Sequence, residues 1–351
     1  MKKILIIMMG LYILIPLKAY AVGDYSQQLD KITEEYNLDI SLYENFSLEN
    51  VADYITDNIK DKIERPFELA IKLIAIVFLY SVAKSVYSDD MADSVYDNIC
   101  VLIVFTNLLS PLRETIGIII DNLFQIKNFM VAFLPVYSGI SFASGEFLTS
   151  TIYTGLFLTS VIAVSNMCIT FILPSIEIYF AIIVSDTLSS FVRLKSLGEF
   201  YIKIIKTIMK TAVSVICFML TLQTTISHGK DTLAVKAGKL ISGGAIPVIG
   251  SALQDAIGSV YAGMEAIKGY AGAIGISAVV AVFVPSLISL TIYWLCTNFI
   301  HIIADIFDAV SLKKCLSGFI QAIELLIAVV ILFMIMMIFS FTVMISITNG
   351  A

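Results

Sequence analysis

Long apolar runs dominate the chain after residue 66, and short polar stretches separate them. A helix needs about 20 apolar residues to cross the hydrocarbon core of a bilayer. We therefore predict an all-α fold, a polytopic α-helical membrane protein with about seven to eight transmembrane helices. The predicted spans are 67–87, 98–112, one crossing within 115–145, 147–176, 178–192, 211–229, 271–300 and 325–347.

The first 21 residues have the pattern of a cleavable signal peptide. Lys2 and Lys3 precede the apolar run Ile4–Leu17, and Ala19-Tyr20-Ala21 fits a cleavage site with small residues at alternating positions. An uncleaved first helix is the alternative, but 14 apolar residues are fewer than a span needs. Both interpretations place residue 22 outside the cytoplasm.

Residues 22–66 form an acidic segment with eleven acidic and four basic residues, a net charge of −7. Apolar residues at helical spacing within 29–36 and 51–59 predict two short amphipathic helices, and a solvated linker is the alternative. We divide the chain into a signal peptide at 1–21, this extracytoplasmic segment at 22–66 and a membrane domain at 67–351.

The composition agrees with a membrane environment. The chain of 351 residues is 58% hydrophobic and only 14% charged, whereas a soluble domain is about 25% charged. The net charge of −6 argues against nucleic acid as a partner, so the lipid bilayer is the expected surrounding. The five cysteines include no CxxC pair, and we predict buried free thiols.

The basic residues are concentrated in one predicted loop. Arg193, Lys195, Lys203, Lys206 and Lys210 lie between the fifth and sixth predicted spans. Cytoplasmic loops carry an excess of lysine and arginine, so we expect this stretch in the cytoplasm, on the opposite side from the N-terminal segment.

A glycine-rich segment at 237–275 differs from the rest of the membrane domain. Nine of its 39 residues are glycine, and Pro247 lies among them. Glycine and proline weaken helices, and irregular backbone at membrane depth needs protein or water around it. We predict either a re-entrant loop with a packed helix or an amphipathic helix on the outer surface.

This segment also resembles a known family. Residues 233–250, followed by Asp255, are similar to the signature of the stage III sporulation protein AE family, a stretch of the type K-x-I-x-G-x-x-I-P-V-V-G with an aspartate after it. Residues 128–135, with Ser144-Gly145 after them, resemble a second family stretch, while Gly258 stands where a second aspartate is often found. The matching positions are Lys239, Ile241, Gly243, Ile246, Pro247, Val248, Gly250 and Asp255.

The resemblance implies a role in endospore development. It implies a multi-pass protein of the mother-cell membrane around the forespore, in a channel or secretion-like complex. The implied partners are the other stage III sporulation operon A membrane proteins, their ATPase, and a forespore protein across the intermembrane space. The candidate functional or packing positions in the signature are Lys239, Gly243, Pro247, Gly250 and Asp255.

Two acidic residues near the fifth predicted span are further candidates, because ionisable groups within membrane helices are often functional. Glu177 and Asp186 lie nine residues apart, 2.5 helical turns, and so face roughly opposite sides. Glu177 also follows Pro174 closely, where a helix N-terminus would favour a negative charge. Helix capping or interfacial placement and a pathway-lining role both remain open.

The sequence contains no motif for catalysis in a supporting context, and we expect no enzyme activity, no cofactor and no metal. His228 and His301 have no companion at metal-ligand spacing. Since no P-loop is present, ATP-driven transport would require a separate ATPase. A stand-alone secondary transporter for a small solute is the alternative function. Several polar residues are predicted to form interhelical hydrogen bonds or to lie at the interface, including Asn107, Asn298, His301, Asp305 and Glu324.

Overall fold

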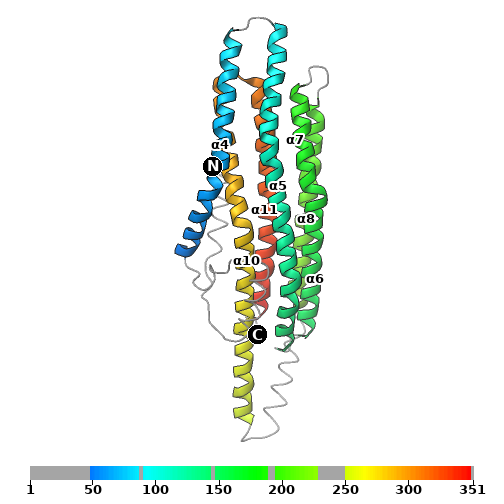
Figure 1. The fold of residues 1–351 in the computed structure, drawn as a ribbon. Coiled ribbons are helices and arrows are strands. Elements are labelled where there is room, and N and C mark those ends of the chain that lie inside the picture. The colour runs from blue at the N-terminus through cyan, green and yellow to red at the C-terminus, as the bar shows by residue number, and fades with distance from the viewer. Residues whose placement is uncertain (1–47, 87–89, 144–146, 189–193, 228–249, 349–351) are drawn as a thin grey trace.

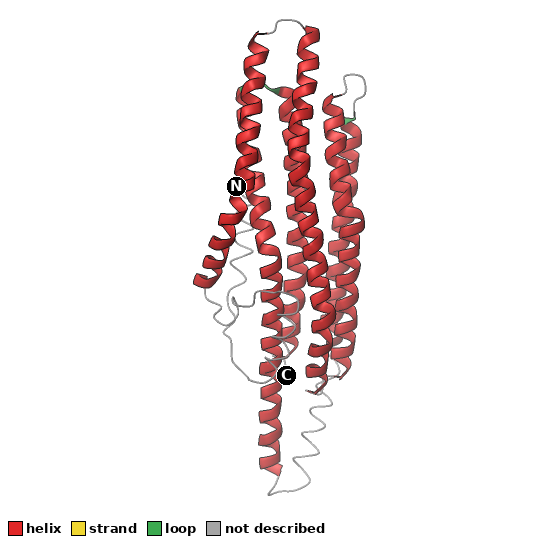
Figure 2. Ribbon diagram, in the orientation of Figure 1, coloured by secondary structure: helices red, strands yellow, loops and turns green. Residues whose placement is uncertain are grey.

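A computed structural model describes residues 48–86, 90–143, 147–188, 194–227 and 250–348, which are helical apart from short turns and contain no strand. The predicted signal peptide and the first amphipathic stripe lie outside these residues. Figure 1 shows a long bundle whose helices alternate in direction, and Figure 2 shows its helical content. The predicted all-α class is confirmed. The elements are α4 (Leu48–Val86), α5 (Asp90–Ala143), α6 (Phe147–Met167), the π-helical segment η1 (Cys168–Ile172), α7 (Leu173–Leu188), α8 (Lys195–Ser227), α10 (Gly250–Ile306) and α11 (Val310–Thr348).

Several of the described helices have the length and apolar composition of membrane spans. In the described part, five helices are long and apolar enough to cross a bilayer: Ile63–Ser85, Val95–Gly139, Thr154–Leu188, Gly269–Ile306 and Val310–Thr342. Main-chain hydrogen bonds close within each helix, which is the arrangement that hydrocarbon requires of a spanning segment.

The predicted separation of two spans at residues 112–115 is wrong, because α5 is one helix of 54 residues, about 81 Å long. Arg113 and Glu114, which suggested a polar break, instead form ion pairs with neighbouring helices. Pro111 lies inside the helix as well, and Thr115 Oγ donates to its carbonyl at 2.7 Å. Because both charges are paired, Arg113 and Glu114 do not interrupt α5.

The predicted separation at residues 176–178 is also wrong. The chain continues from α6 through η1 into α7, although Pro174 removes one backbone donor. The N–H of Leu173 bonds to the carbonyl of Cys168, which is the wider i→i+5 turn of a π-helix. This extra residue in the turn lets the helix continue past the proline ring. The two merged pairs shorten the predicted series of spans by two, and the predicted span 211–229 is not among the five candidates of the described residues.

The glycine-rich segment contains a helix rather than a loop over its described part. α10 runs for 57 residues from Gly250, about 85 Å, and it includes the predicted span 271–300. Its N-terminal part extends beyond the ends of the other helices (Figure 1). A separate surface helix is therefore ruled out for 250–270, while the prediction for 237–249 lies outside the described residues.

The predicted start of the membrane domain at residue 67 does not coincide with a break between two helices either. α4 includes the predicted second amphipathic stripe and continues past Pro66 to Val86. Its N-terminal part slants away from the bundle (Figure 1). Pro66 lacks a backbone N–H, and a proline within a helix is a common cause of a bend.

The core of the bundle is aromatic and aliphatic. Phe341 on α11 contacts Phe133 on α5 and Phe157 on α6, with ring centroids 5.7 and 5.8 Å apart in edge-to-face geometry. Gly275 on α10 lies against the Phe341 ring so closely that a methyl group there would overlap it. Small residues thus let α10 and α11 approach each other.

The cysteines are free, as predicted, but not all are buried. Cys100, Cys168 and Cys315 lie in the core, and Cys296 is half-buried. Cys217 on α8 is exposed, which corrects the prediction for that residue. It lies on a face that the described neighbours of α8 do not cover.

Candidate functional site

A tight turn joins α10 to α11 and determines which residues of the two helices meet. Asp308 has a positive φ of 52°, and its N–H bonds to the carbonyl of Asp305 at 3.1 Å. The N–H of Ala309 bonds to the carbonyl of Ala304 at 2.9 Å. These bonds define a Schellman motif, and Ala304 and Ala309 are both buried, which supplies its usual apolar contact.

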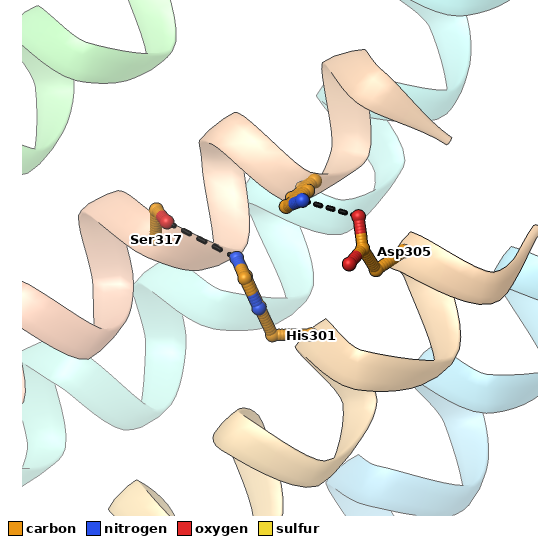
Figure 3. A network of polar contacts seen from close by, with 4 residues as sticks. His301, Asp305 and Ser317 are labelled. Atoms are coloured by element: carbon orange, nitrogen blue, oxygen red, sulfur yellow. Dashed lines mark hydrogen bonds and ion pairs between the residues drawn. The ribbon is translucent and has the colours of Figure 1, made fainter. Parts of the chain in front are cut away.

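Two polar pairs link α10 and α11 in the turns next to this connection (Figure 3). Ser317 Oγ and His301 Nε2 are 3.2 Å apart, and they belong to α11 and α10 respectively. Lys313 on α11 forms an ion pair with Asp305 on α10. The prediction of interhelical hydrogen bonds is therefore confirmed for His301 and Asp305.

The Ser317–His301 contact brings together a hydroxyl and an imidazole, the groups of a nucleophile and its base. The surrounding groups do not complete a catalytic site. The Asp305 carboxylate bonds to Lys313 rather than to the imidazole of His301. Ser317 lies within α11, where neighbouring backbone N–H groups form helical bonds and do not point at a developing oxyanion. The pair is best explained as a tie between two helices.

A second network joins three helices near the same end of the bundle. Tyr80 on α4 is fully buried, and its hydroxyl donates to Asp97 Oδ1 on α5 at 2.7 Å. Ser311 Oγ on α11 donates to Asp97 Oδ2 at 2.9 Å. Lys84 Nζ donates to the Tyr80 hydroxyl at 3.2 Å. We call Tyr80, Lys84, Asp97 and Ser311 the tyrosine–aspartate cluster. Each carboxylate oxygen of Asp97 has a donor from a different helix.

A third group of polar residues crosses the bundle near its middle. Arg65 on α4 forms an ion pair with Glu114 on α5, and Arg113 Nε lies 3.5 Å from Glu177 Oε2 on α7. Two hydrogen bonds continue the series to α10 and α11, from Tyr179 to Gln321 and from Trp294 to Glu324. We call this group the polar belt: Arg65, Arg113, Glu114, Glu177, Tyr179, Trp294, Gln321 and Glu324.

The polar belt separates two halves of the bundle. The upper half lies between the belt and the α10–α11 turn, and the lower half lies on the other side of the belt. The prediction of an interhelical contact is confirmed for Glu324, which accepts from Trp294 at 3.3 Å. The amides of Asn107 and Asn298 donate to carbonyls of their own helices, Ile103 and Trp294, so for these two the predicted interfacial position is the alternative that stays open.

A proline in α10 is supported by a side chain from α5. Pro285 has no backbone N–H, so a carbonyl of the preceding turn loses its usual donor. The amide of Asn122 donates to the carbonyl of Val282 at 3.1 Å and to Ser286 Oγ at 2.7 Å. The helical donor missing at Pro285 would have served the carbonyl of Ala281, four residues earlier, so Asn122 binds the adjacent carbonyl beside the proline and does not replace the missing N–H. Sequence analysis did not single out Asn122, because it lies among other polar residues, Asp121, Gln125 and Lys127, and nothing in its own stretch points to Pro285.

The candidate residues of the signature do not gather at these networks. Lys239, Gly243 and Pro247 lie outside the described residues. Gly250 is the first residue of α10, and Asp255 lies in its second turn. The 39 residues between Asp255 and Trp294 correspond to about 58 Å of helix, so Asp255 lies far from the polar belt.

Glu177 has a different role from the one predicted at a helix N-terminus. No helix begins near it, because η1 continues directly into α7. Its half-buried carboxylate instead pairs with Arg113. Asp186 lies nine residues further along α7, is partly buried, and forms no ion pair with another described residue. The structure does not bring Glu177 and Asp186 together, in agreement with their spacing.

Across the described ranges, no three His, Cys, Asp or Glu side chains come close enough to hold a metal ion. Within these ranges the polar groups instead connect helices in pairs and triplets.

The long apolar helices and their internal polar ties define a class, the α-helical membrane proteins with several candidate spans. Comparison with protein families then identifies the member: residues 32–348 match the model of stage III sporulation protein AE. The chain belongs to the stage III sporulation protein AE family, as the signature predicted, and its role is in sporulation. No curated protein and no solved structure matches the chain.

Proposed function

We propose that the chain is a membrane subunit of the channel or secretion-like complex between mother cell and forespore. The family match over nearly the whole chain is the observation that carries this proposal. The chain spans the mother-cell membrane several times, with its N-terminal segment extracytoplasmic. Its partners are the other stage III sporulation operon A membrane proteins, their ATPase and a forespore protein across the intermembrane space.

The architecture supports a structural or conducting subunit over an enzyme. In the described part, polar groups are used between helices, as in the tyrosine–aspartate cluster and the polar belt. Such ties orient helices relative to one another within an apolar surrounding. We propose that the protein has no catalytic activity of its own, and that energy for transport comes from the ATPase partner.

The alternative, a stand-alone secondary transporter, would be favoured by helices broken near the membrane midplane. The described helices instead continue past Pro174 and Pro285. The observed continuity therefore favours the complex subunit over the transporter.

The proposed membership of the complex is tested by affinity purification from sporulating cells in mild detergent. We expect the tagged chain to retain the other operon proteins and the ATPase, as identified by mass spectrometry. A tagged unrelated membrane protein of similar abundance is the control. Recovery of the chain alone, together with solute uptake by liposomes that contain only this protein, would instead establish the transporter.

The role of the signature is tested separately by Asp255→Asn and Gly250→Ala, with spore yield and membrane protein level measured together. We expect spore yield to fall while the protein level is maintained. Gly155→Ala is the matched control, because no atom lies within 4 Å of the added Cβ. Normal yield from both signature variants would remove residues 250–255 from the mechanism.

A further inference from the structure

We propose that copies of this chain associate side by side through α4 of one copy and α8 of the next. The two helices lie on opposite flanks of the bundle, with other helices between them (Figure 1). Since the two faces differ, the contact is heterologous, and its repetition gives a ring or an open row. The inference does not depend on the proposed role in a channel.

The outer face of α4 carries a largely exposed apolar stripe, in which Phe78 also meets the ring of Phe307 edge to face. Phe67, Ile71, Phe78 and Val82 are 53%, 67%, 55% and 47% exposed. Their spacing of i, i+4, i+11 and i+15 places them on one side of the helix. The opposite side of α4 is already used, because it packs against α10 and α5 and buries residues such as Leu73.

The outer face of α8 combines an apolar stripe with a basic one. Leu197, Phe200 and Ile204 are exposed at spacings of i, i+3 and i+7. Beside them, Lys203, Lys206 and Lys210 are exposed at the same spacings. The inner side of α8 buries Gly198, Ile205 and Ala212.

The polar belt shows that the lower part of the α4 stripe and the α8 stripe have the same height in the bundle. Arg65 on α4 pairs with Glu114, and the adjacent Arg113 pairs with Glu177 on α7. Arg65 and Glu177 are therefore at nearly the same level. Phe67 and Ile71 begin immediately above this level on α4.

The level on α8 follows from its contact with α7. A Cβ placed on Gly198 would lie 3.0 Å from Ile183 Cδ1, so these two residues face each other. Glu177 is six residues, or about 9 Å, before Ile183. Because α8 runs antiparallel to α7, the residue level with Glu177 is about six positions after Gly198, near Ile204.

A single surrounding medium does not suit both faces at this height. Hydrocarbon at the level of the belt would meet exposed Lys203 and Lys206 of α8, and charged groups are costly within a membrane. Water at this level would meet Phe67 and Ile71 on α4, and exposed apolar patches are typical of interaction sites. Contact between the two faces would cover Phe67 and Ile71 with the apolar stripe of α8.

The charges beside the stripes favour a second copy as the occupant. α4 and α8 run in opposite directions, so Phe67 and Ile71 would face the region of Leu197–Ile204. Glu64, which is exposed on α4, would then face Lys203 and Lys206. An acidic group thus meets basic groups at the height where the apolar residues match.

Disulfide cross-linking in membranes tests this arrangement. Two differently tagged copies carry Ile71→Cys and Leu197→Cys, each with Cys217→Ser to remove the exposed native thiol. The host cells lack other sporulation proteins, so the result is separate from the proposed complex. We expect a cross-linked dimer with both tags when the copies are expressed together, and none from either copy alone. Phe171→Cys replaces Leu197→Cys as the control, since Phe171 is 61% exposed but lies about 20 Å lower.

Charge exchange provides the second arm. We expect Lys206→Glu, introduced into the Leu197→Cys copy, to lower the yield of cross-linked dimer by about tenfold. Glu64→Lys in the other copy should restore it. Normal membrane levels without any mixed dimer would overturn the proposal and leave the α4 face to lipid. Cross-linking of the Ile71→Cys copy with itself would overturn the heterologous contact, and an unchanged yield with Lys206→Glu would overturn the charge matching.

Discussion

The lower half of the bundle is joined mainly by apolar side chains, with Asn122 as a polar tie, whereas the upper half and the belt add several polar ties to an apolar core. Below the belt, residues 269–293 of α10 and 325–342 of α11 carry no charge, and Phe341 meets two other phenylalanine rings there. Above it, Tyr80, Asp97 and Ser311 connect three helices through two hydrogen bonds. The difference shows that α10 and α11 are held together by close packing of side chains at one end of the pair and by hydrogen bonds at the other.

The largest effect is expected from filling the space at Gly275 in the lower half. Gly275→Ala would place a methyl group within the Phe341 ring position. We expect the free energy of unfolding to fall by about 3 kcal/mol or more, the upper range of the cost of overpacking, because the methyl group would overlap a buried ring. The measurement is denaturant unfolding of the purified protein in detergent micelles.

Two variants make this prediction specific. Gly155→Ala has open space around its Cβ and should leave stability unchanged or raise it, because alanine is the better helix former. Phe341→Ala removes the ring that the new methyl group would overlap. The combination of Phe341→Ala and Gly275→Ala should therefore destabilise the protein by less than the sum of the two single substitutions. Equal effects of the two glycine substitutions would contradict close packing at Gly275.

An intermediate effect is expected from the tyrosine–aspartate cluster. Tyr80→Phe removes the donor to Asp97 Oδ1 while keeping the ring in the core. We expect a loss of about 1.5–3 kcal/mol, the range for a hydrogen bond to a charged group. Unfolding of Tyr80→Phe alone, Asp97→Asn alone and the double variant gives the coupling between the two residues. Additive effects would show that the bond contributes nothing to stability.

The smallest effect is expected at the α10–α11 turn, and its sign is opposite. Asp308 adopts a φ of 52°, a conformation that glycine accepts without steric cost. We expect Asp308→Gly to stabilise the protein by up to about 1 kcal/mol. Lys314→Gly, within α11, is the control and should destabilise it by about 1 kcal/mol. Destabilisation by both substitutions would argue against the left-handed turn.

Sequence patterns predicted the bodies of the helices well, because apolar length is a local property. Residues 325–347 were predicted as one span and lie within α11. The continuity of α5 was not predictable in the same way. Arg113 and Glu114 look like a loop within their own stretch, and only their partners Glu177 and Arg65, distant in sequence, explain why the helix continues.

The polar ties show the same limit. His301 and Ser317 are 16 residues apart, and a turn that reverses the chain is needed to bring them within 3.2 Å. That turn is centred on Asp308 rather than on glycine, the residue that usually signals a Schellman motif. The family signature was recognisable because it depends on residue identity at fixed spacing. The geometry around Glu177 depends instead on packing of distant segments.

The unbroken length of α10 has a mechanical consequence. From Trp294, where the helix is tied to α11, to its first residue Gly250 there are 44 residues, or about 66 Å of continuous rod. A tilt of about 5° around that tie would displace the Gly250 end by about 6 Å. A small rotation of α10 at the polar belt would thus produce a much larger displacement of its N-terminal end.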